Sequence, residues 1–308
     1  MPPTLERTRI IVFAIKAGGS AKTSSCTALA AELGLRGYRV LVVDLDSQSN
    51  ATTHLGCRDF AEGQKCIIDV MDQKAELREV IVPARYLLDP SVLDMDEEEL
   101  KEKKLTRDKA YHPVPNVDIA PCDIYHESND DTETILGLRE NAAFWLQDEL
   151  SDVRDEYDVI LIDCPGSYGR VTVSAFVTLD DQVDGEVLPA VLCTTKEAEA
   201  LDILDRKLKA VREDRTYRRR RIAPTVKKLL VCGAPTASHG YAEDRTTLAE
   251  YLDDYGDRML PPVSFSGHVR SVHRNQTALP ILYPKGRGAE DYRKVATELG
   301  FPRLQSDS

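Results

Sequence analysis

The segment FAIKAGGSAKTSS, residues Phe13 to Ser25, decides the predicted fold. It begins within the apolar run RIIVFAI (9–15), which is typical of a buried strand, and leads into a helix expected from about Lys22 to Arg36. Backbone N–H groups in such a glycine-rich loop, together with the positive end of the helix dipole, favour a phosphate chain. The segment therefore predicts a nucleotide site in which Lys22 reaches the terminal phosphates and Thr23 places its hydroxyl on Mg²⁺.

Strands alternate with helices along the rest of the chain. The further strands are expected at 39–46, 117–121, 157–165, 185–193 and 226–233, with a short one near 258–263. The further helices are expected at 132–153, 196–214, 241–256 and 289–299. This order predicts an α/β fold with a mostly parallel, twisted sheet covered by helices on both faces. We expect a single domain over 1–308, with a charged insertion at about 57–116 that holds one or two helices.

Acidic residues follow two of the predicted strands. Asp44 and Asp46 end the run VLVVDLD, and Asp163 ends VILID. Ligands of open parallel sheets bind at the carboxyl ends of the strands, where the phosphate loop also lies. Asp44 and Asp46 suit metal-binding and water-positioning roles, although an isolated aspartate in such a place more often caps a helix or turn. Asp163 is expected to reach Mg²⁺ through its water shell.

Composition limits the other classes of function. No run of about 18 apolar residues is present, which argues against a membrane span, and the net charge of −12 argues against a chain that coats DNA over its whole surface. The seven cysteines are scattered, so buried thiols are expected rather than disulfides. Cys122 and His126 alone are too few to form a metal site.

Three motifs carry a family resemblance. They are AGGSAKTS (17–24), DLDSQSNAT (44–52) and LIDCPGSYG (161–169), and two C-terminal segments, HVR (268–270) and PILYPKGRGAEDY (280–292), support them. The chain resembles the ParA/Soj/MinD group of P-loop NTPases with a deviant Walker A loop, and most closely the ParA partition ATPases. The resemblance spans nearly the whole chain except the 57–116 insertion.

The resemblance implies ATP and Mg²⁺ as cofactors and a slow, partner-stimulated ATPase. It also implies a homodimer formed on ATP, nonspecific DNA binding, a ParB-type adaptor and a cytoplasmic, nucleoid-associated protein. Asp46 matches the aspartate associated with hydrolysis, Asp163 the Walker B carboxylate, and Arg270 an arginine used for DNA contact. The residues expected to surround Mg²⁺ are Thr23, Asp44, Asp46 and Asp163. The nucleotide loop comprises Gly18, Gly19, Ser20, Ala21, Lys22, Thr23 and Ser24.

The chain departs from the family pattern at several positions. Ala17 stands where the family has a lysine that crosses the dimer to the partner's phosphates. Two other lysines are candidates to replace it. Lys16 lies one residue before that position, and Lys196 follows the strand expected at 185–193. Ala21 replaces a glycine, which adds a methyl group and penalises a positive φ angle. Ser47 and Gly166 replace prolines. We expect nucleotide binding to be retained and hydrolysis to be slow or differently arranged.

A basic run connects two core elements. Between Arg206 and Lys228 there are eleven lysines and arginines against two acids, and the tract Arg218, Arg219, Arg220 and Arg221 is its centre. Such a run is either a solvated helix face or a source of phosphate contacts for nonspecific DNA binding.

Several functions remain open beside DNA partition. One is a ParA-like positioner of a protein cargo, and another is an ATP-dependent dimer scaffold without turnover. A MinD-like membrane switch is disfavoured, because the C-terminal residues ATELGFPRLQSDS lack a basic amphipathic end.

Overall fold

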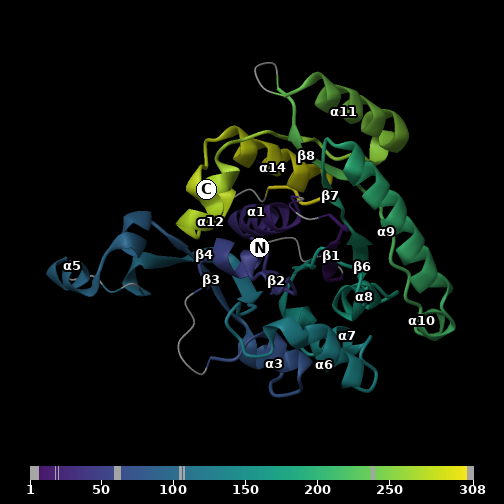
Figure 1. Cartoon of the computed structure of the whole chain (residues 1–308), viewed down its shortest axis with the longest axis horizontal. Coiled ribbons are helices and arrows are strands. Elements are labelled where there is room, and N and C mark those ends of the chain that lie inside the picture. The colour runs from purple at the N-terminus through teal and green to yellow at the C-terminus, as the bar shows by residue number, and fades with distance from the viewer. Residues whose placement is uncertain are drawn as a thin grey trace.

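The computed structural model describes residues 7–17, 19, 21–58, 64–103, 106, 108–236 and 240–303. Its six-stranded central sheet has the order β3-β4-β2-β5-β1-β6 (Figure 1). All neighbours are parallel except β3 and β4, which form an antiparallel pair at the edge. The strands are β1 (Arg9–Phe13), β2 (Val40–Asp44), β3 (Val82–Leu87), β4 (Tyr111–Ala120), β5 (Val159–Asp163) and β6 (Asp184–Val187). The predicted α/β fold is confirmed.

A second sheet of three parallel strands continues from the first. It consists of β7 (Ala190–Leu192), β8 (Leu230–Ala234) and β9 (Val263–Ser264). The prediction of one strand over 185–193 is wrong, because this segment divides into β6 and β7. Leu188 donates its backbone N–H to Val12 of β1, whereas Pro189 accepts a hydrogen bond from Leu230 at the start of β8. The chain therefore changes its partner strand at Pro189, which has no N–H of its own to donate.

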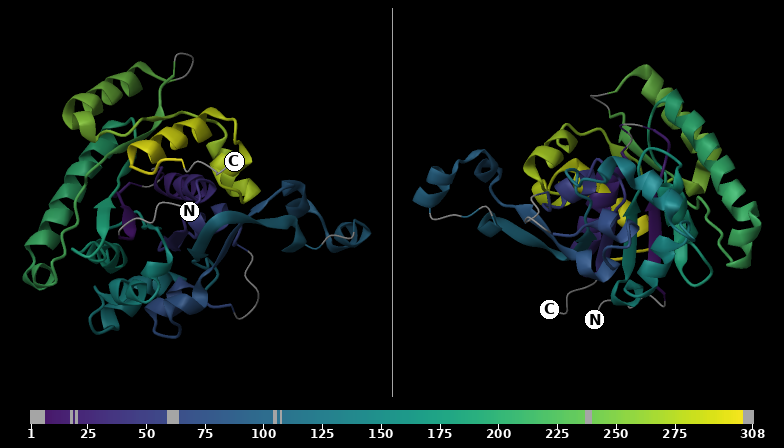
Figure 2. Two further views of the ribbon diagram at one scale, coloured as in Figure 1. Left: turned by 180° about the vertical axis from the view of Figure 1, so that it is seen from behind. Right: turned by 60° about the horizontal axis from the view of Figure 1, so that its bottom comes forward.

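Alternate strand residues pack against helices on the two faces of the central sheet. Ile10, Val12 and Leu41 belong to one buried cluster, with helices α3 (Ile67–Met71), α6 (Thr132–Leu138), α7 (Trp145–Ser151) and α8 (Arg170–Val177). Ile11 and Phe13 belong to the other, with α1 (Lys22–Leu35), α13 (Leu279–Leu282) and α14 (Arg287–Glu298). Figures 1 and 2 show these two helical layers. Strands buried on both faces explain the continuous apolar runs in the sequence.

The second sheet has its own helical cover. Helix α9 (Thr195–Glu213) runs along the edge of the molecule to α10 (Arg215–Arg219), and α11 (Ala242–Tyr255) lies beyond β8 (Figure 1). Val191, Val231, Leu201 and Tyr251 join in one buried cluster here. The short helices α2 (Asn50–His54) and α12 (Val269–Asn275) complete the elements used below.

The helix predicted over 132–153 is also wrong, because the chain leaves the helical conformation after Leu138. Arg139 is extended, and Asn141 has a φ of 56°. The Arg139 guanidinium donates hydrogen bonds to the carbonyls of Val70 and Met71 at the end of α3 and lies over the Trp145 ring. These tertiary contacts outweigh the helical pattern and separate α6 from α7.

The 57–116 segment contributes more to the fold than an insertion with one or two helices. Its described residues contain α3, α4 (Leu77–Val80) and α5 (Glu97–Glu102), together with strand β3 and the first residues of β4. Around α5 the chain extends away from the body in Figures 1 and 2 and has a small core of its own, formed by Leu87, Val92, Leu100 and Ala110. The prediction for this segment was therefore wrong about its helices and missed the antiparallel strand pair.

Two compositional expectations can be compared with the structure. All seven cysteines are free and buried, as predicted. Within the described part of the chain, no helix has both the length and the apolar character needed to cross a membrane.

Candidate functional site

The predicted phosphate loop joins β1 to α1. Gly18 and Ser20, two of its predicted members, lie outside the described residues. Gly19 has a φ of 75°, in the left-handed region that favours glycine. Ala21 has a φ of −78°, so the predicted strain at this position is wrong, because alanine adopts this conformation freely. Of the described loop residues, Gly19 is therefore the one that needs to be glycine.

Lys22 begins α1 and points back toward the loop. Its side chain is buried, with 5% of the residue exposed, and its Nζ donates a hydrogen bond to the Ala17 carbonyl at 3.1 Å. Burial raises the pKa values of Asp46 and Asp163, and the charge of Lys22 opposes that rise in both. This lysine is thus the positive centre of the predicted site, held in place by the loop itself.

Asp163 ends β5 at the level of the ends of β1 and β2. Its register partners are Phe13 and Asp44, so the three strand ends meet at one place. Asp163 is fully buried, and neither carboxylate oxygen has a hydrogen-bond partner among the described residues. Burial raises its pKa well above the ordinary value, and the charge of Asp44 adds to this, while the Thr23 hydroxyl opposes it. A buried carboxylate without partners is costly unless a cation or a proton compensates it.

Asp44 is engaged in hydrogen bonds that shape the loop after β2. One of its oxygens accepts from the backbone N–H and the hydroxyl of Thr52, at 2.8 and 2.7 Å, and the other accepts from the Asp46 N–H at 3.2 Å. Burial raises its pKa to about 7 in spite of these bonds. The structure thus gives Asp44 the turn-forming role of an isolated aspartate, and a direct metal role for it stays a prediction.

Asp46 is less enclosed than Asp44. Its Oδ1 accepts the Gln48 N–H at 3.1 Å. Burial raises its pKa, and the hydrogen bond from Gln48 and the charge of Lys22 oppose that rise. A partly exposed carboxylate beside the phosphate-loop lysine can accept a proton or orient a water molecule.

Glu197 is a site residue that the sequence analysis missed. It lies in the first turn of α9, is 4% exposed, and its Oε2 has no hydrogen-bond partner among the described residues. Burial raises its pKa, and the charge of Lys22 is the largest effect opposing that rise. Its place directly after a buried strand, beside Lys196, was the signal that could have found it.

Lys16 and Lys196, the two replacements considered for the family's lysine, are both exposed. The Lys16 backbone N–H donates to the Tyr168 hydroxyl at 3.0 Å, which fixes the loop against the segment after β5. Lys196 lies in the first turn of α9, and its charge acts on Glu197. Thr23 and Ser24, in the first turn of α1, are partly exposed. Lys16 and Lys196 therefore both remain candidates to replace the family's lysine.

The arginines predicted to contact DNA lie in two separate places. Arg270 is exposed on α12, whereas the 218–221 tract lies at α10, and Figure 1 shows these helices on opposite sides of the molecule. Arg220 lies over the Phe144 ring, and Arg221 pairs with Asp181 at 2.7 Å. Arg218 and Arg219 are exposed without an ion-pair partner in the described parts of the chain. The tract therefore divides into two arginines with intramolecular contacts and two without.

Cys122 and His126 do not come together as metal ligands. The ligand atoms of His126 group instead with those of Cys66 and Asp69, within 4.8 Å of one another. The Nδ1 atom of His126 accepts the Ser128 N–H, and Asp69 accepts the Cys66 N–H as part of the start of α3. Accepting at Nδ1 places the histidine proton on Nε2, the atom nearest Asp69, which is the wrong tautomer for a ligand there. These contacts stabilise the fold.

The chain is similar in sequence to a known family and to several curated proteins. Residues 8–216 match a family model described as an AAA domain. The cell division protein PomZ of Myxococcus xanthus is 31% identical over 166 residues, which cover 53% of this chain and 41% of PomZ. The sporulation initiation inhibitor protein Soj of Bacillus subtilis is 31% identical over 175 residues, which cover 57% of this chain and 56% of Soj. The chain thus spans about half the length of these curated relatives.

Solved structures share the fold at low sequence identity. An ATP complex of McdA from Cyanothece has a TM-score of 0.73 at 15% identity and covers 97% of this chain and 99% of its own. The septum site-determining protein MinD of Pyrococcus horikoshii, complexed with Mg-ADP, has a TM-score of 0.66 at 19% identity, with coverages of 95% and 96%. With the phosphate loop, the strand-end carboxylates and the matched family model, the chain belongs to the AAA-domain family as a ParA/MinD-like P-loop ATPase.

Proposed function

We propose that this chain is a partition-type ATPase that binds Mg²⁺ and ATP, dimerises on ATP, binds DNA nonspecifically and moves DNA with a ParB-type adaptor. The observation that carries the proposal is the Asp163 carboxylate, fully buried and without a hydrogen-bond partner among the described residues, beside Lys22 and Thr23. A carboxylate in this position is compensated by a cation, as the nucleotide's Mg²⁺ would provide.

The donor set fits ATP and Mg²⁺. Hydroxyl and carboxylate oxygens are the ligands that Mg²⁺ prefers, and Thr23 and Asp163 supply one of each. Lys22 would hold the terminal phosphates once it leaves the Ala17 carbonyl. The solved structures that share the fold include an ATP complex of McdA and a Mg-ADP complex of MinD. When bound, Mg²⁺ neutralises negative charge on the phosphates.

Asp46 is the residue that we propose for hydrolysis. Its Oδ1 is held by the Gln48 N–H, and its carboxylate lies near the Lys22 charge. A carboxylate fixed in this way can orient a water molecule toward the terminal phosphate. Asp44 would act through the loop, since its oxygens hold Thr52 and the Asp46 N–H.

ATP hydrolysis by wild type and Lys22→Ala, with and without Mg²⁺, tests this proposal. We expect Mg²⁺-dependent turnover in wild type and none in the variant. Lys209→Ala is the matched control, because Lys209 is exposed and its ion pair among the described residues is with the exposed Glu213, at 3.8 Å. Equal hydrolysis by Lys22→Ala and Lys209→Ala would contradict the assignment of the loop.

DNA binding is proposed for the exposed arginines. Arg218, Arg219 and Arg270 are exposed without ion-pair partners in the described residues, so their charges are available for phosphates. The test is ATP-dependent retention on nonspecific duplex DNA as a function of salt. Neutralising 218–219 should weaken retention more than neutralising 220–221, because the second pair already has intramolecular contacts. Retention that is the same with and without ATP would reject nucleotide-controlled DNA binding.

A second candidate is an ATP-dependent dimer scaffold without turnover. The observation that favours it is Ala17, which is buried at the position of the family's dimer-crossing lysine. ATP-dependent dimerisation without hydrolysis, in the presence of DNA, would identify this scaffold. Dimerisation with hydrolysis but without DNA retention would instead favour a positioner of a protein cargo.

A further inference from the structure

A pocket of about 450 Å³ lies beside the phosphate loop and outside the residues assigned to the nucleotide. It is bounded by the start of α8, by α9 and α10, and by α6 with the turn that follows it. Its lining includes Glu133, Tyr168, Arg170, Val173, Lys207 and Tyr217. Pockets of this size hold small ligands or a few side chains of a bound segment. The segments that form it are distant in the sequence, so the fold creates the pocket.

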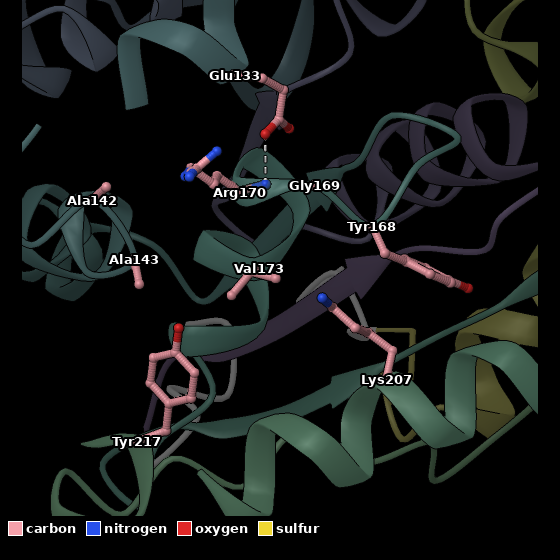
Figure 3. A pocket seen from close by; sticks show the side chains of 9 residues that line it. All are labelled: Glu133, Ala142, Ala143, Tyr168, Gly169, Arg170, Val173, Lys207 and Tyr217. Carbon is pink, nitrogen blue, oxygen red and sulfur yellow. Dashed lines mark hydrogen bonds between the residues drawn. The ribbon is translucent and has the colours of Figure 1, made fainter. Parts of the chain in front are cut away.

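The pocket contains two cations that form no ion pair in the described part of the chain. Arg170 is exposed and Lys207 is half-buried, and neither side chain has an ion pair or hydrogen bond in the described part of the chain. Glu133 supplies one negative charge to the lining, and its carboxylate accepts the backbone N–H groups of Arg170 and Val171, at 2.7 and 3.2 Å, rather than pairing with either cation. Figure 3 shows this carboxylate directed at the start of α8. The pocket therefore has an excess of positive charge.

Apolar and aromatic surface separates the two cations. In Figure 3 the Lys207 ammonium points toward Val173 from α9, whereas the Arg170 side chain points away from α9. The Tyr217 ring forms part of the wall and is held by an edge contact with Phe144, at a centroid distance of 5.8 Å. A small anion would meet one cation and leave the apolar wall uncovered. A chain with acidic and apolar side chains would cover both.

Tyr168 connects the pocket to the nucleotide site. It lines the pocket, and its hydroxyl accepts the Lys16 backbone N–H of the phosphate loop. Burial raises the pKa of Tyr168 to about 12, so its hydroxyl stays protonated at neutral pH. A segment bound in the pocket would contact Tyr168, which in turn contacts the phosphate loop.

We propose that this pocket is a docking site for an acidic segment of a partner protein, whose carboxylates pair with Arg170 and Lys207 while an apolar side chain packs on Val173. Charge complementarity identifies the partner's chemistry. Docking itself does not depend on hydrolysis, and only its effect on the phosphate loop rests on the proposed function. The docking proposal and the proposed ATPase function can therefore be refuted independently of each other.

The test measures binding of a fluorescein-labelled peptide, Glu-Leu-Glu-Glu-Leu-Glu, by fluorescence anisotropy with the full nucleotide-free chain. We expect saturable binding that weakens with salt, and about a tenfold weaker Kd for Arg170→Gln or Lys207→Gln, because each removes one charged contact. Lys209→Gln and Arg219→Gln are matched controls from α9 and α10, and should change the Kd less than twofold. Unchanged thermal unfolding of all four variants verifies that they fold.

Two further arms separate the proposal from simpler explanations. The same peptide with glutamine in place of every glutamate should not bind. Citrate, as a free small anion, should displace the labelled peptide only at concentrations far above those of the unlabelled peptide. The proposal is overturned if the peptide does not bind, if the control variants weaken binding as much as Arg170→Gln, or if citrate competes as well as the peptide.

Discussion

Replacing Asp163 by asparagine should make the nucleotide-free protein more stable at neutral pH and abolish its response to Mg²⁺. Asparagine has nearly the same shape, and no hydrogen bond of the described residues is lost, because neither Asp163 oxygen has one. The substitution removes a fully buried carboxyl that lies in register with Asp44. It also removes the negative charge that we propose is compensated by Mg²⁺. Stability and ligand response should therefore change in opposite directions.

The size of the effect follows from protonation. Burial, and then the charge of Asp44, raises the pKa of Asp163 well above its ordinary value. The folded protein therefore keeps a proton that the unfolded chain has released. The contribution of Asp163 to the stability of wild type is highest below the unfolded pKa of about 4 and falls by about 1.4 kcal/mol per pH unit until the folded pKa is reached. Between pH 5 and 6.5, the stability of Asp163→Asn relative to wild type should therefore rise, by at most about 2 kcal/mol.

Urea unfolding of wild type and variant at several pH values, in EDTA, measures this difference. Groups that do not interact with Asp163 titrate alike in both proteins and cancel, including His54, whose pKa burial lowers to about 3. Asp44, whose pKa burial raises to about 7, lies in register with Asp163, so its titration is part of the measured difference. Asp158→Asn is the matched control at the other end of the same segment. Asp158 is also buried, but it accepts hydrogen bonds from Arg39 at 2.8 and 3.2 Å, so its replacement should cost about 1–3 kcal/mol.

The second readout is the Tm in the presence of ATP, measured once in EDTA and once in excess Mg²⁺. The difference between these two values is the Mg²⁺-dependent shift. Wild type should show such a shift, and Asp163→Asn should show none. The reasoning is refuted if the stability difference between the two proteins is the same at pH 5 and pH 6.5. It is also refuted if the variant keeps the full Mg²⁺-dependent shift.

Three further predictions concern the loop and the basic tract. Gly19→Ala should lower the free energy of unfolding by about 1 kcal/mol, because alanine is strained at a φ of 75°. Ala21→Gly should change it by less than about 0.5 kcal/mol, because residue 21 has an ordinary negative φ. Chemical denaturation measures both changes. Lys16→Ala should keep ATP binding by calorimetry but lose ATP-dependent dimerisation in light scattering, and normal dimerisation would exclude Lys16 as the replacement lysine. Neutralising Arg218 and Arg219 should reduce the salt slope of log K for DNA by about 2, since each phosphate contact contributes about 0.9.

The strand ends were predictable because their pattern is local. A buried strand in a parallel sheet gives an apolar run, and an acid directly after it is placed at the edge where ligands bind. The structure confirms the strand-end positions of Asp44 and Asp163, which are register partners on neighbouring strands. The sequence could not show that they would differ in role. Asp44 finds its partners in Thr52 and Asp46 once α2 has folded, whereas Asp163 finds none among the described residues.

The errors arose where contacts between distant residues overrule a local pattern. The 132–153 segment has a helical composition, but Arg139 binds the carbonyls at the end of α3 and divides it. The run 185–193 has the composition of one strand, but its two halves pair with β1 and β8. At Ala21 the family pattern suggested a glycine-like conformation that the backbone does not adopt.

The packing around residue 17 explains how the loop can lack its family lysine. Ala17 is 3% exposed and belongs to the buried cluster of the second sheet, and its carbonyl accepts the Lys22 ammonium. A lysine at this position would have to leave that cluster to carry its charge to a partner subunit. Lys16 is already exposed, and Tyr168 holds its backbone, so its charge needs no such rearrangement. The chain thus uses position 17 for packing, and a charge that reaches across a dimer would have to come from another residue, such as the exposed Lys16 or Lys196.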